Sequence, residues 1–406
     1  MGPILIVGGG VGGAGCALAL HRAGYDVTVY EARPEPEETP PRAGPRPALW
    51  WGDDLGAFLT LASNGMRALG AAGAAEAAAA AGFELTEMRV LAESGERIAA
   101  IPLSGHADPL TRFRCVRRAE LCAVLRQEAE RRGVAVHYGA RLTAVEEDAD
   151  GVTARFADGR TARGALLIGA DGLNSATRTL IDPGTAAPRY AGQRVFYGYT
   201  TAVTPPPEPL PRITMVRGGA AFGFAVSPGG ETYWFARVTG PELPAAELAA
   251  APVQQWRTDL VELLRADATP AADIVATTGD LMATNARDLP DVPRWSTART
   301  LVIGDAAHAA SPATGQGASM ALEDAVVLAK ALRDEATTAA ALEAYERVRR
   351  PRVSHNIANS ARLTGARRGG PTTDVERRAA AEHPPPPPGE EDPGIVRLLD
   401  WTAPLP

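Results

Sequence analysis

The sequence predicts an α/β protein of two domains, and three observations support this prediction. A chain of 406 residues exceeds what one hydrophobic core usually organises. The first thirty-one residues read as strand, glycine-rich turn, helix and strand, an order that is typical of a parallel sheet. Residues 190–240 instead carry short, aromatic-rich segments between turn signals, which indicate a second domain built on an antiparallel sheet.

Composition excludes several classes of protein. With 45% hydrophobic and 22% charged residues, the chain has the composition of a soluble globular protein. A net charge of −7 argues against nucleic-acid binding and against a basic membrane-surface protein. No apolar run approaches the ~20 residues that a bilayer span requires, and the N-terminus lacks the charged start of a signal peptide. We therefore expect a soluble, cytoplasmic protein, as a monomer or a homodimer.

The cysteines do not indicate a metal site or a disulfide framework. Three cysteines, Cys16, Cys115 and Cys122, are an odd number without metal-ligand spacing. We expect them to be reduced and buried, and we expect no bound metal.

The first unit contains a dinucleotide-binding fingerprint. Ile4–Val7 reads as a buried strand and is followed by Gly8-x-Gly10-x-x-Gly13 and a helix that ends near Gly24. The first glycine permits a tight turn, the second lets a pyrophosphate approach the backbone, and the third lets the helix pack on the strand. Glu31, at the end of the strand Asp26–Tyr30, is placed to accept hydrogen bonds from ribose hydroxyls.

Later elements follow from helix propensity, apolar runs and turn residues. An alanine-rich stretch favours a helix, and Asp-Gly pairs predict hairpin turns. We expect helices over Ala71–Ala81, Arg118–Arg132, from the glycine loop to Leu332, and Ala339–Leu363; strands over Val134–Tyr138, Leu142–Glu147, Val152–Phe156, Leu166–Ile168, Val195–Val203, Arg212–Val216, Ala221–Val226, Tyr233–Val238 and Thr300–Ile303; and an extended proline-rich tail.

A second glycine-containing motif indicates a flavin. A strand delivers Gly304-Asp305 to a turn, and a loop with Pro312, Gly315 and Gly317 then opens a helix. Such an arrangement suits a ribityl chain beside the aspartate and a flavin ring whose anionic edge faces the helix N-terminus. The fingerprint alone does not separate FAD from NAD, whereas this second motif favours FAD.

In these motifs the chain resembles the group A FAD-dependent monooxygenases, the aromatic hydroxylases with the p-hydroxybenzoate hydroxylase fold. The resemblance covers about residues 3–365 and includes Arg118-x-x-Leu121, Gly169-Ala170-Asp171-Gly172 with Ser175 and Arg178, and Arg349-Arg350-Pro351-Arg352. It implies a Rossmann-like FAD domain from residues 1–70, 101–182 and 296–365, a substrate domain from 71–100 and 183–295, and a C-terminal tail over 366–406.

The resemblance also implies roles for individual residues. Arg118 would contact the FAD phosphates, and the Asp171-Gly172 segment would serve both FAD and the nicotinamide cofactor. Asp305 would hydrogen-bond the ribityl hydroxyls, while the N–H groups of Gly317 and Ala318 would hold the pyrimidine edge of the flavin.

Catalytic and substrate residues are less well defined by the sequence. His308 is a weak candidate for a catalytic base, because a histidine in such a motif is more often structural. Either Arg42 or Arg46 would be the arginine that relatives place over the flavin. Alternation along the strands puts Phe222 with Phe224 on one face, and Tyr233 with Phe235 on one face. We list these four aromatic residues as substrate candidates.

The implied reaction is hydroxylation of a bulky aromatic or polyketide-like molecule, as in antibiotic biosynthesis. NAD(P)H would reduce FAD, and O2 would react as a flavin C4a-hydroperoxide. Same-fold enzymes that perform epoxidation, Baeyer–Villiger insertion or oxidative rearrangement remain alternatives, as does a redox-silent FAD-binding protein. A flavin-dependent halogenase usually carries Trp-x-Trp-x-Ile-Pro and a catalytic lysine, but this chain lacks that segment and its single lysine is Lys330.

Overall fold

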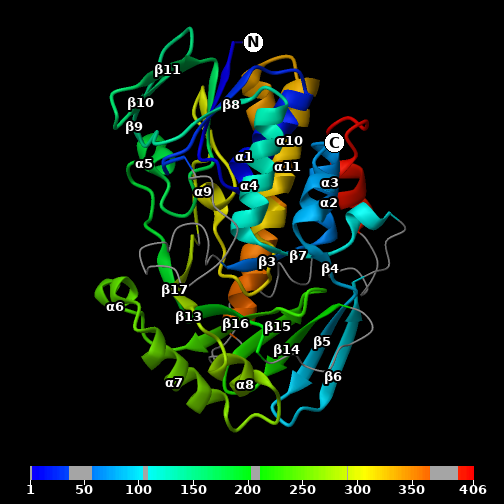
Figure 1. Cartoon of the computed structure of the whole chain (residues 1–406). Coiled ribbons are helices and arrows are strands. Elements are labelled where there is room, and N and C mark those ends of the chain that lie inside the picture. Colours follow the sequence, from blue (N-terminus) through cyan, green and yellow to red (C-terminus); the bar gives the residue numbers. More distant parts are fainter. Residues whose placement is uncertain (1, 36–56, 104–107, 203–210, 290, 366–391) are drawn as a thin grey trace.

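A five-stranded parallel sheet forms the centre of the first domain (Figure 1). The computed structural model describes residues 2–35, 57–103, 108–202, 211–289, 291–365 and 392–406. Ile4 pairs with Val27 on one side and with Leu166 on the other, so the first strand lies inside the sheet. The strand order is β18 (Thr300–Val302), β12 (Leu166–Gly169), β1 (Ile4–Val7), β2 (Val27–Tyr30) and β8 (Ala135–His137).

Long helices cover this sheet and create the main core. Within that core, α1 and α10 approach closely, because a Cβ on Gly15 would lie 2.6 Å from a methyl carbon of Leu322. None of the helices in the described ranges combines the length and the apolar character that crossing a bilayer requires. The principal helices are α1 (Val11–Arg22), α4 (Arg118–Arg131), α10 (Gly317–Asp334) and α11 (Thr338–Gly365).

A small antiparallel sheet extends the first domain. It consists of β9 (Leu142–Glu147), β10 (Val152–Phe156) and β11 (Thr161–Gly164). Two of these strands have the predicted bounds. The turn at Asp158-Gly159 joins β10 to β11, and Gly159 there has a φ of +88°, a conformation that glycine adopts without steric cost.

A seven-stranded sheet forms the second domain, as the aromatic-rich segments predicted. Neighbouring strands are antiparallel except for β14 and β5, which are parallel. One face packs against α7 (Val253–Leu264) and α8 (Ala271–Ala276). The order is β17 (Leu281–Asp288), β13 (Arg189–Thr200), β16 (Thr232–Thr239), β15 (Ala221–Val226), β14 (Arg212–Arg217), β5 (Glu87–Ala92) and β6 (Arg97–Pro102).

The segment around the predicted domain boundary at residue 71 packs with the first domain. The alanine-rich segment forms two helices, α2 (Ser63–Ala71) and α3 (Ala75–Ala81), and both pack in the core of the first domain. Small alanine side chains let α3 lie close to α4. The substrate sheet therefore receives only β5 and β6 from this part of the chain.

A fourth, short sheet lies between the two domains (Figure 1). It has the order β3 (Phe58–Leu61), β7 (Arg114–Arg117) and β4 (Phe83–Glu84), and its strands are antiparallel. The sequence does not predict this sheet, because strands of two to four residues are too short to show a pattern of alternating apolar and polar residues.

The C-terminal residues 392–406 return to the first domain, so the prediction of an extended tail is wrong for them. Helix α13 (Pro393–Leu399) packs against α2 and α10 and buries Leu398 and Leu399. The buried Nζ of Lys330 donates to the carbonyl oxygens of Leu398 and Asp400, each at 2.7 Å. Trp401 lies between the guanidinium groups of Arg22 and Arg333, 5.0 and 5.1 Å from its ring centre.

We predict that Lys330→Met lowers the free energy of unfolding by about 1–3 kcal/mol, because it leaves two carbonyl oxygens of the docked segment without their donor. Chemical denaturation followed by tryptophan fluorescence measures the change. Arg397→Met, at an exposed position of α13, serves as the control. Equal denaturation midpoints for the two variants would contradict the anchoring role of Lys330.

Candidate active site

The three glycines of the fingerprint meet three different steric demands. Gly8 has a φ of +103°, and a Cβ there would lie 2.4 Å from the carbonyl oxygen of Ala170. A Cβ on Gly13 would lie 1.8 Å from the carbonyl oxygen of Gly8, so only glycine lets α1 pack against the turn. Around Gly10, in contrast, no described atom lies within 4 Å of the Cβ position. This open space beside the start of α1 fits an approaching pyrophosphate.

Glu31 lies against the same turn. Its Oε2 accepts a hydrogen bond from the N–H of Gly9 at 2.6 Å, and its Oε1 accepts one from the N–H of Arg33 at 2.9 Å. Arg126 donates to the carbonyl oxygen of Gly9 from α4. The carboxylate at the end of β2 is therefore fixed next to the glycine turn, and its predicted bond to a ribose stays a prediction.

The second loop presents Asp305 shortly after the end of β18. Gly304, with a φ of +58°, turns the chain after β18 into the short helix α9 (Asp305–His308). The side chain of Asp305 is exposed, yet desolvation raises the pKa of its carboxyl group, whereas the charges of His308 and Arg118 lower it. An accessible group that nevertheless has protein on most sides is expected beside a bound ligand.

The start of α10 faces this carboxylate. Asp305 Oδ1 lies 3.9 Å from the Cβ position of Gly317, the first residue of an 18-residue helix. Gly315 adopts a φ of +65°, and Pro312, Gly315 and Gly317 are all exposed. The loop thus leaves the helix N-terminus open to a ligand with negative charge. Together with the open face of Gly10 and the exposed Arg118, these groups fit FAD.

Asp171 is engaged in organising the neighbouring loop. Its Oδ1 accepts a hydrogen bond from Ser175 Oγ at 2.5 Å, and its Oδ2 accepts from the backbone N–H and the hydroxyl of Thr177 at 2.9 and 3.0 Å. These bonds hold the start of α5 (Ala176–Ile181). From α5, Arg178 donates to the carbonyl oxygen of Ala306, which ties this loop to α9. The cofactor role of Asp171-Gly172 stays a prediction.

His308 is buried in the core. Its Nε2 lies 2.6 Å from Asp324 Oδ2, and its ring packs 5.6 Å from that of Trp295. This placement favours the structural interpretation of His308 over the catalytic one. The other candidate for catalysis, Arg46, lies outside the described residues, and so does Arg42.

A buried ion network contacts both ends of residues 304–317, which we call the flavin loop. Asp324 Oδ2 accepts the N–H of Gly304 at 2.8 Å, and its Oδ1 accepts Arg349 Nε at 2.7 Å. The same guanidinium donates to Glu323, whose other oxygen accepts Asn64 Nδ2 at 2.7 Å. Asn64 also donates to Gln316 at 3.1 Å. The network therefore contacts the flavin loop at Gln316 as well as at Gly304.

The charges in this network determine how Asp324 titrates. Burial raises the pKa of Asp324, but His308 and Arg349 outweigh it and hold the pKa at about 2. The arginine stays charged, because Glu323 and Asp324 outweigh the burial that lowers its pKa. Arg349 is part of the motif that carries the family resemblance, but the sequence predicts no role for it. No pattern in the sequence links it to residues 323 and 324.

The structure separates the four substrate candidates onto two faces of the second sheet. Phe222 and Phe224 pack with Trp234 against α7 and α8, on the face of the sheet that is turned away from the first domain. Tyr233 and Phe235 lie on the opposite face, which packs against Phe58 of the first domain. Alternation predicted the pairs correctly, but it does not say which face of a sheet meets the cofactor domain.

The face that carries Tyr233 and Phe235 also presents Tyr197, which is half-buried, toward the first domain. Burial raises the pKa of Tyr197, whereas Arg237 and Arg118 lower it. The charge of Arg118 lowers the pKa of Asp305 as well. We define the aromatic face as Tyr197, Tyr199, Met215, Tyr233 and Phe235.

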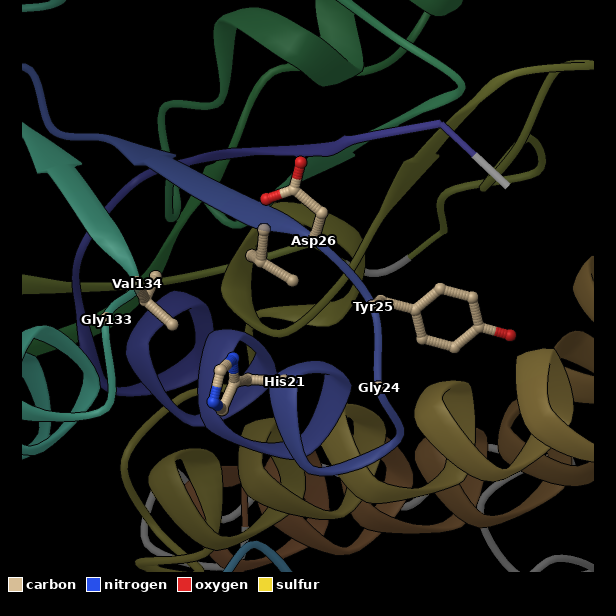
Figure 2. A pocket seen from close by; sticks show the side chains of 7 residues that line it. His21, Gly24, Tyr25, Asp26, Gly133 and Val134 are labelled. Atoms are coloured by element: carbon tan, nitrogen blue, oxygen red, sulfur yellow. The ribbon is translucent and has the colours of Figure 1, made fainter.

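A separate pocket of about 300 Å³ lies elsewhere in the first domain (Figure 2). His21, Tyr25, Asp26 and Val134 are among its lining residues, and Tyr25 points away from it to donate to the carbonyl oxygen of Leu332. It opens where β2 begins, whereas the flavin-binding loops follow the carboxyl ends of the strands. The position argues against this pocket as the active site.

We predict that protonation of Asp324 destabilises the protein in acid. Its pKa is about 2 in the folded protein, well below the ordinary value near 3.9. A depressed pKa contributes stability that is present above pH ~4 and is lost as the pH falls toward 2. Chemical denaturation at several pH values between 3 and 6 should show this loss in the wild type and a weaker pH dependence in Asp324→Asn. Parallel pH profiles of the two proteins would contradict the assignment.

Comparison with known proteins agrees with this geometry. The model of the FAD binding domain family matches residues 1–360. The chain is 34% identical to aurachin C monooxygenase/isomerase of Stigmatella aurantiaca, over 89% of this chain and 88% of that protein. It is also 34% identical to the 3-amino-4-hydroxybenzoate 2-monooxygenase PtnB3 of Streptomyces platensis, over 86% and 84%.

A solved structure extends the similarity to the fold. The Klebsiella pneumoniae protein HpxO, crystallised with FAD and uric acid, superposes with a TM-score of 0.77 and 28% identity, covering 98% of this chain and 96% of that one. The predicted fold, a Rossmann-like domain with a second domain on a largely antiparallel sheet, is confirmed. The chain belongs to the FAD binding domain family of FAD-dependent monooxygenases, and FAD is its cofactor.

Proposed function

We propose that the protein uses NAD(P)H and O2 to hydroxylate a bulky aromatic or polyketide-like molecule. The observation that carries this proposal is the aromatic face, whose rings pack against Phe58 on the side of the sheet that meets the first domain. Large aromatic side chains suit a bulky aromatic substrate that packs against them. Its tyrosines are neutral near pH 7, because burial raises the pKa of Tyr197, Tyr199 and Tyr233.

The residues of the chain hold and orient the cofactor and exclude water. Asp305 accepts hydrogen bonds from the ribityl hydroxyls, and Arg118 neutralises the phosphates beside the fingerprint turn. The N–H groups of Gly317 and Ala318, at the start of α10, hold the pyrimidine edge of the flavin. Bound FAD supplies the transfer of two electrons from NAD(P)H and the activation of O2. The sequence has no second dinucleotide fingerprint, so we assign NAD(P)H to the same site.

A second candidate reaction has support from one relative. The name of the Stigmatella aurantiaca protein, at 34% identity, joins monooxygenation to isomerisation. An oxygenation followed by rearrangement of the substrate skeleton therefore stands as the alternative to simple hydroxylation. The products of the two reactions have the same mass. Their carbon connectivity, determined by NMR, distinguishes them.

We predict that Asp305→Ala weakens FAD binding by one to two orders of magnitude, because an unpaired polar group in such a site costs about 1–3 kcal/mol. Titration of the apoprotein with FAD, followed by flavin fluorescence, measures the dissociation constant. Asp305→Asn keeps one acceptor oxygen and should fall between the two proteins. An Asp305→Ala protein that binds FAD as tightly as the wild type would rule out this placement of the flavin.

The proposed reaction is tested with a panel of substrates. Purified protein with FAD is given NADH or NADPH and either polycyclic phenols or small benzoates, while O2 uptake is recorded. We expect polycyclic phenols to accelerate NAD(P)H oxidation and to gain one oxygen atom. Strong acceleration by benzoate or salicylate, with no response to polycyclic phenols, would contradict the substrate class. No NAD(P)H oxidation with any compound would favour a redox-silent FAD-binding protein.

A further inference from the structure

We propose that Arg117 is a positioning residue that fixes the aromatic face at its working distance from the flavin-binding loops. Its effect on product formation rests on the proposed function, whereas its effect on the surroundings of bound FAD does not. Arg117 is the last residue of β7, in the short sheet between the domains, and only 6% of its surface is exposed.

The contacts of Arg117 reach across to the substrate sheet. Its Nη2 donates to Glu231 Oε2 at 2.6 Å, just before β16 begins. The guanidinium carbon lies 4.2 Å from the ring centre of Tyr199 on β13 and 5.1 Å from that of Tyr233 on β16. Its Nε also approaches the hydroxyl of Tyr233 at 3.4 Å. One side chain therefore holds two adjacent strands of the substrate sheet.

The chemistry of these contacts favours arginine over lysine. Burial alone lowers the pKa of Arg117, but Tyr233, Glu231 and Tyr199 raise it above the ordinary value, so the group stays charged. A planar guanidinium can stack on aromatic rings while its edge donates to a carboxylate, and an ammonium group has no such plane. The contact thus fixes the orientation of the guanidinium plane relative to the two tyrosine rings as well as its distance from them.

The short sheet connects the aromatic face to the flavin loop. Phe58 of β3 pairs with Arg117 across the sheet, and its ring packs against those of Tyr197, Tyr233 and Phe235. Farther along the same segment, Thr60 Oγ1 lies 3.5 Å from the Cβ position of Gly315, and the N–H of Ala62 donates to Ser319 Oγ at 3.3 Å. The segment 58–62 therefore contacts the aromatic face at one end and the flavin loop at the other.

Register in the substrate sheet completes the connection. Tyr199 pairs with Tyr233, and the next pair on the same face is Tyr197 with Phe235. These two pairs are separated by two residues along each strand, about 7 Å. A shift of the pair that Arg117 contacts consequently moves Tyr197 and Phe235, which pack against Phe58.

Misplacement should divert the electrons of NAD(P)H. In the coupled reaction, substrate, O2, NAD(P)H and a proton give hydroxylated substrate, water and NAD(P)+. When the substrate is out of reach, O2, NAD(P)H and a proton instead give H2O2 and NAD(P)+. Because a misplacement of about 1 Å can slow a reaction by as much as ~100-fold, we expect the H2O2 released per NAD(P)H to rise severalfold in Arg117 variants.

The experiment compares Arg117→Lys and Arg117→Met with the wild type. Arg155→Met is the matched control, because it removes an arginine–glutamate pair from β9 and β10 whose side chains are largely exposed. The readouts are the dissociation constant of FAD, the visible circular dichroism of bound FAD, and H2O2 per NAD(P)H at saturating concentration of the most active polycyclic phenol. If Arg117→Met does not fold, Tyr199→Leu removes the stacking partner instead.

We expect both Arg117 variants to bind FAD with unchanged affinity, to alter the visible circular dichroism and to release more H2O2, with Arg117→Lys closer to the wild type. A variant that is merely less stable, with wild-type circular dichroism and H2O2 yield, would overturn the proposal. If no phenol is oxidised, the proposed function fails but the circular dichroism still decides: a changed spectrum supports the positioning role, and an unchanged one overturns it.

Discussion

The charge of Arg349 is buried at the centre of the first domain, and the architecture of the cofactor site depends on how that charge is neutralised. Its side chain has no exposed surface, and it meets two equally buried carboxylates, Glu323 and Asp324, on α10. A buried charge without partners would cost several kcal/mol. The pairing consequently fixes α11 against α10, and the remaining carboxylate oxygens hold Gly304 and Asn64. A stability requirement thus also determines where the flavin loop lies.

The two domains contribute different kinds of contact to the site. In the first domain, glycines and backbone N–H groups fit FAD, since no described atom lies within 4 Å of the Cβ position of Gly10. The second domain supplies side chains, and its aromatic face is held by Arg117 and Phe58 rather than by a continuous sheet. Cofactor binding is therefore built into the backbone, whereas the choice of substrate depends on rings whose distance from the flavin loop is set by a few contacts.

Local signals in the sequence were sufficient for the cofactor loops but not for long-range packing. Gly8, Gly13 and Asp305 were predictable because each acts within a few residues of its own strand or helix. Phe222 and Phe224 were assigned to the substrate site because alternation defines faces without saying what covers them. Lys330 provides a similar case, because its partners lie some seventy residues later in the chain, beyond any periodic pattern.

The most direct test of this account is the FAD dissociation constant of Arg349→Met, measured together with its free energy of unfolding. Removing the guanidinium takes away the arginine that the two buried carboxylates share and leaves Glu323 with Arg352 and Asp324 with His308. Breaking a buried pair of this kind costs up to about 3–5 kcal/mol. The account predicts a loss of stability in this range together with weaker FAD binding, because Gly304 and Asn64 lose their fixed acceptors. A variant that is destabilised but binds FAD with wild-type affinity would contradict the claim that this ion network holds the flavin loop.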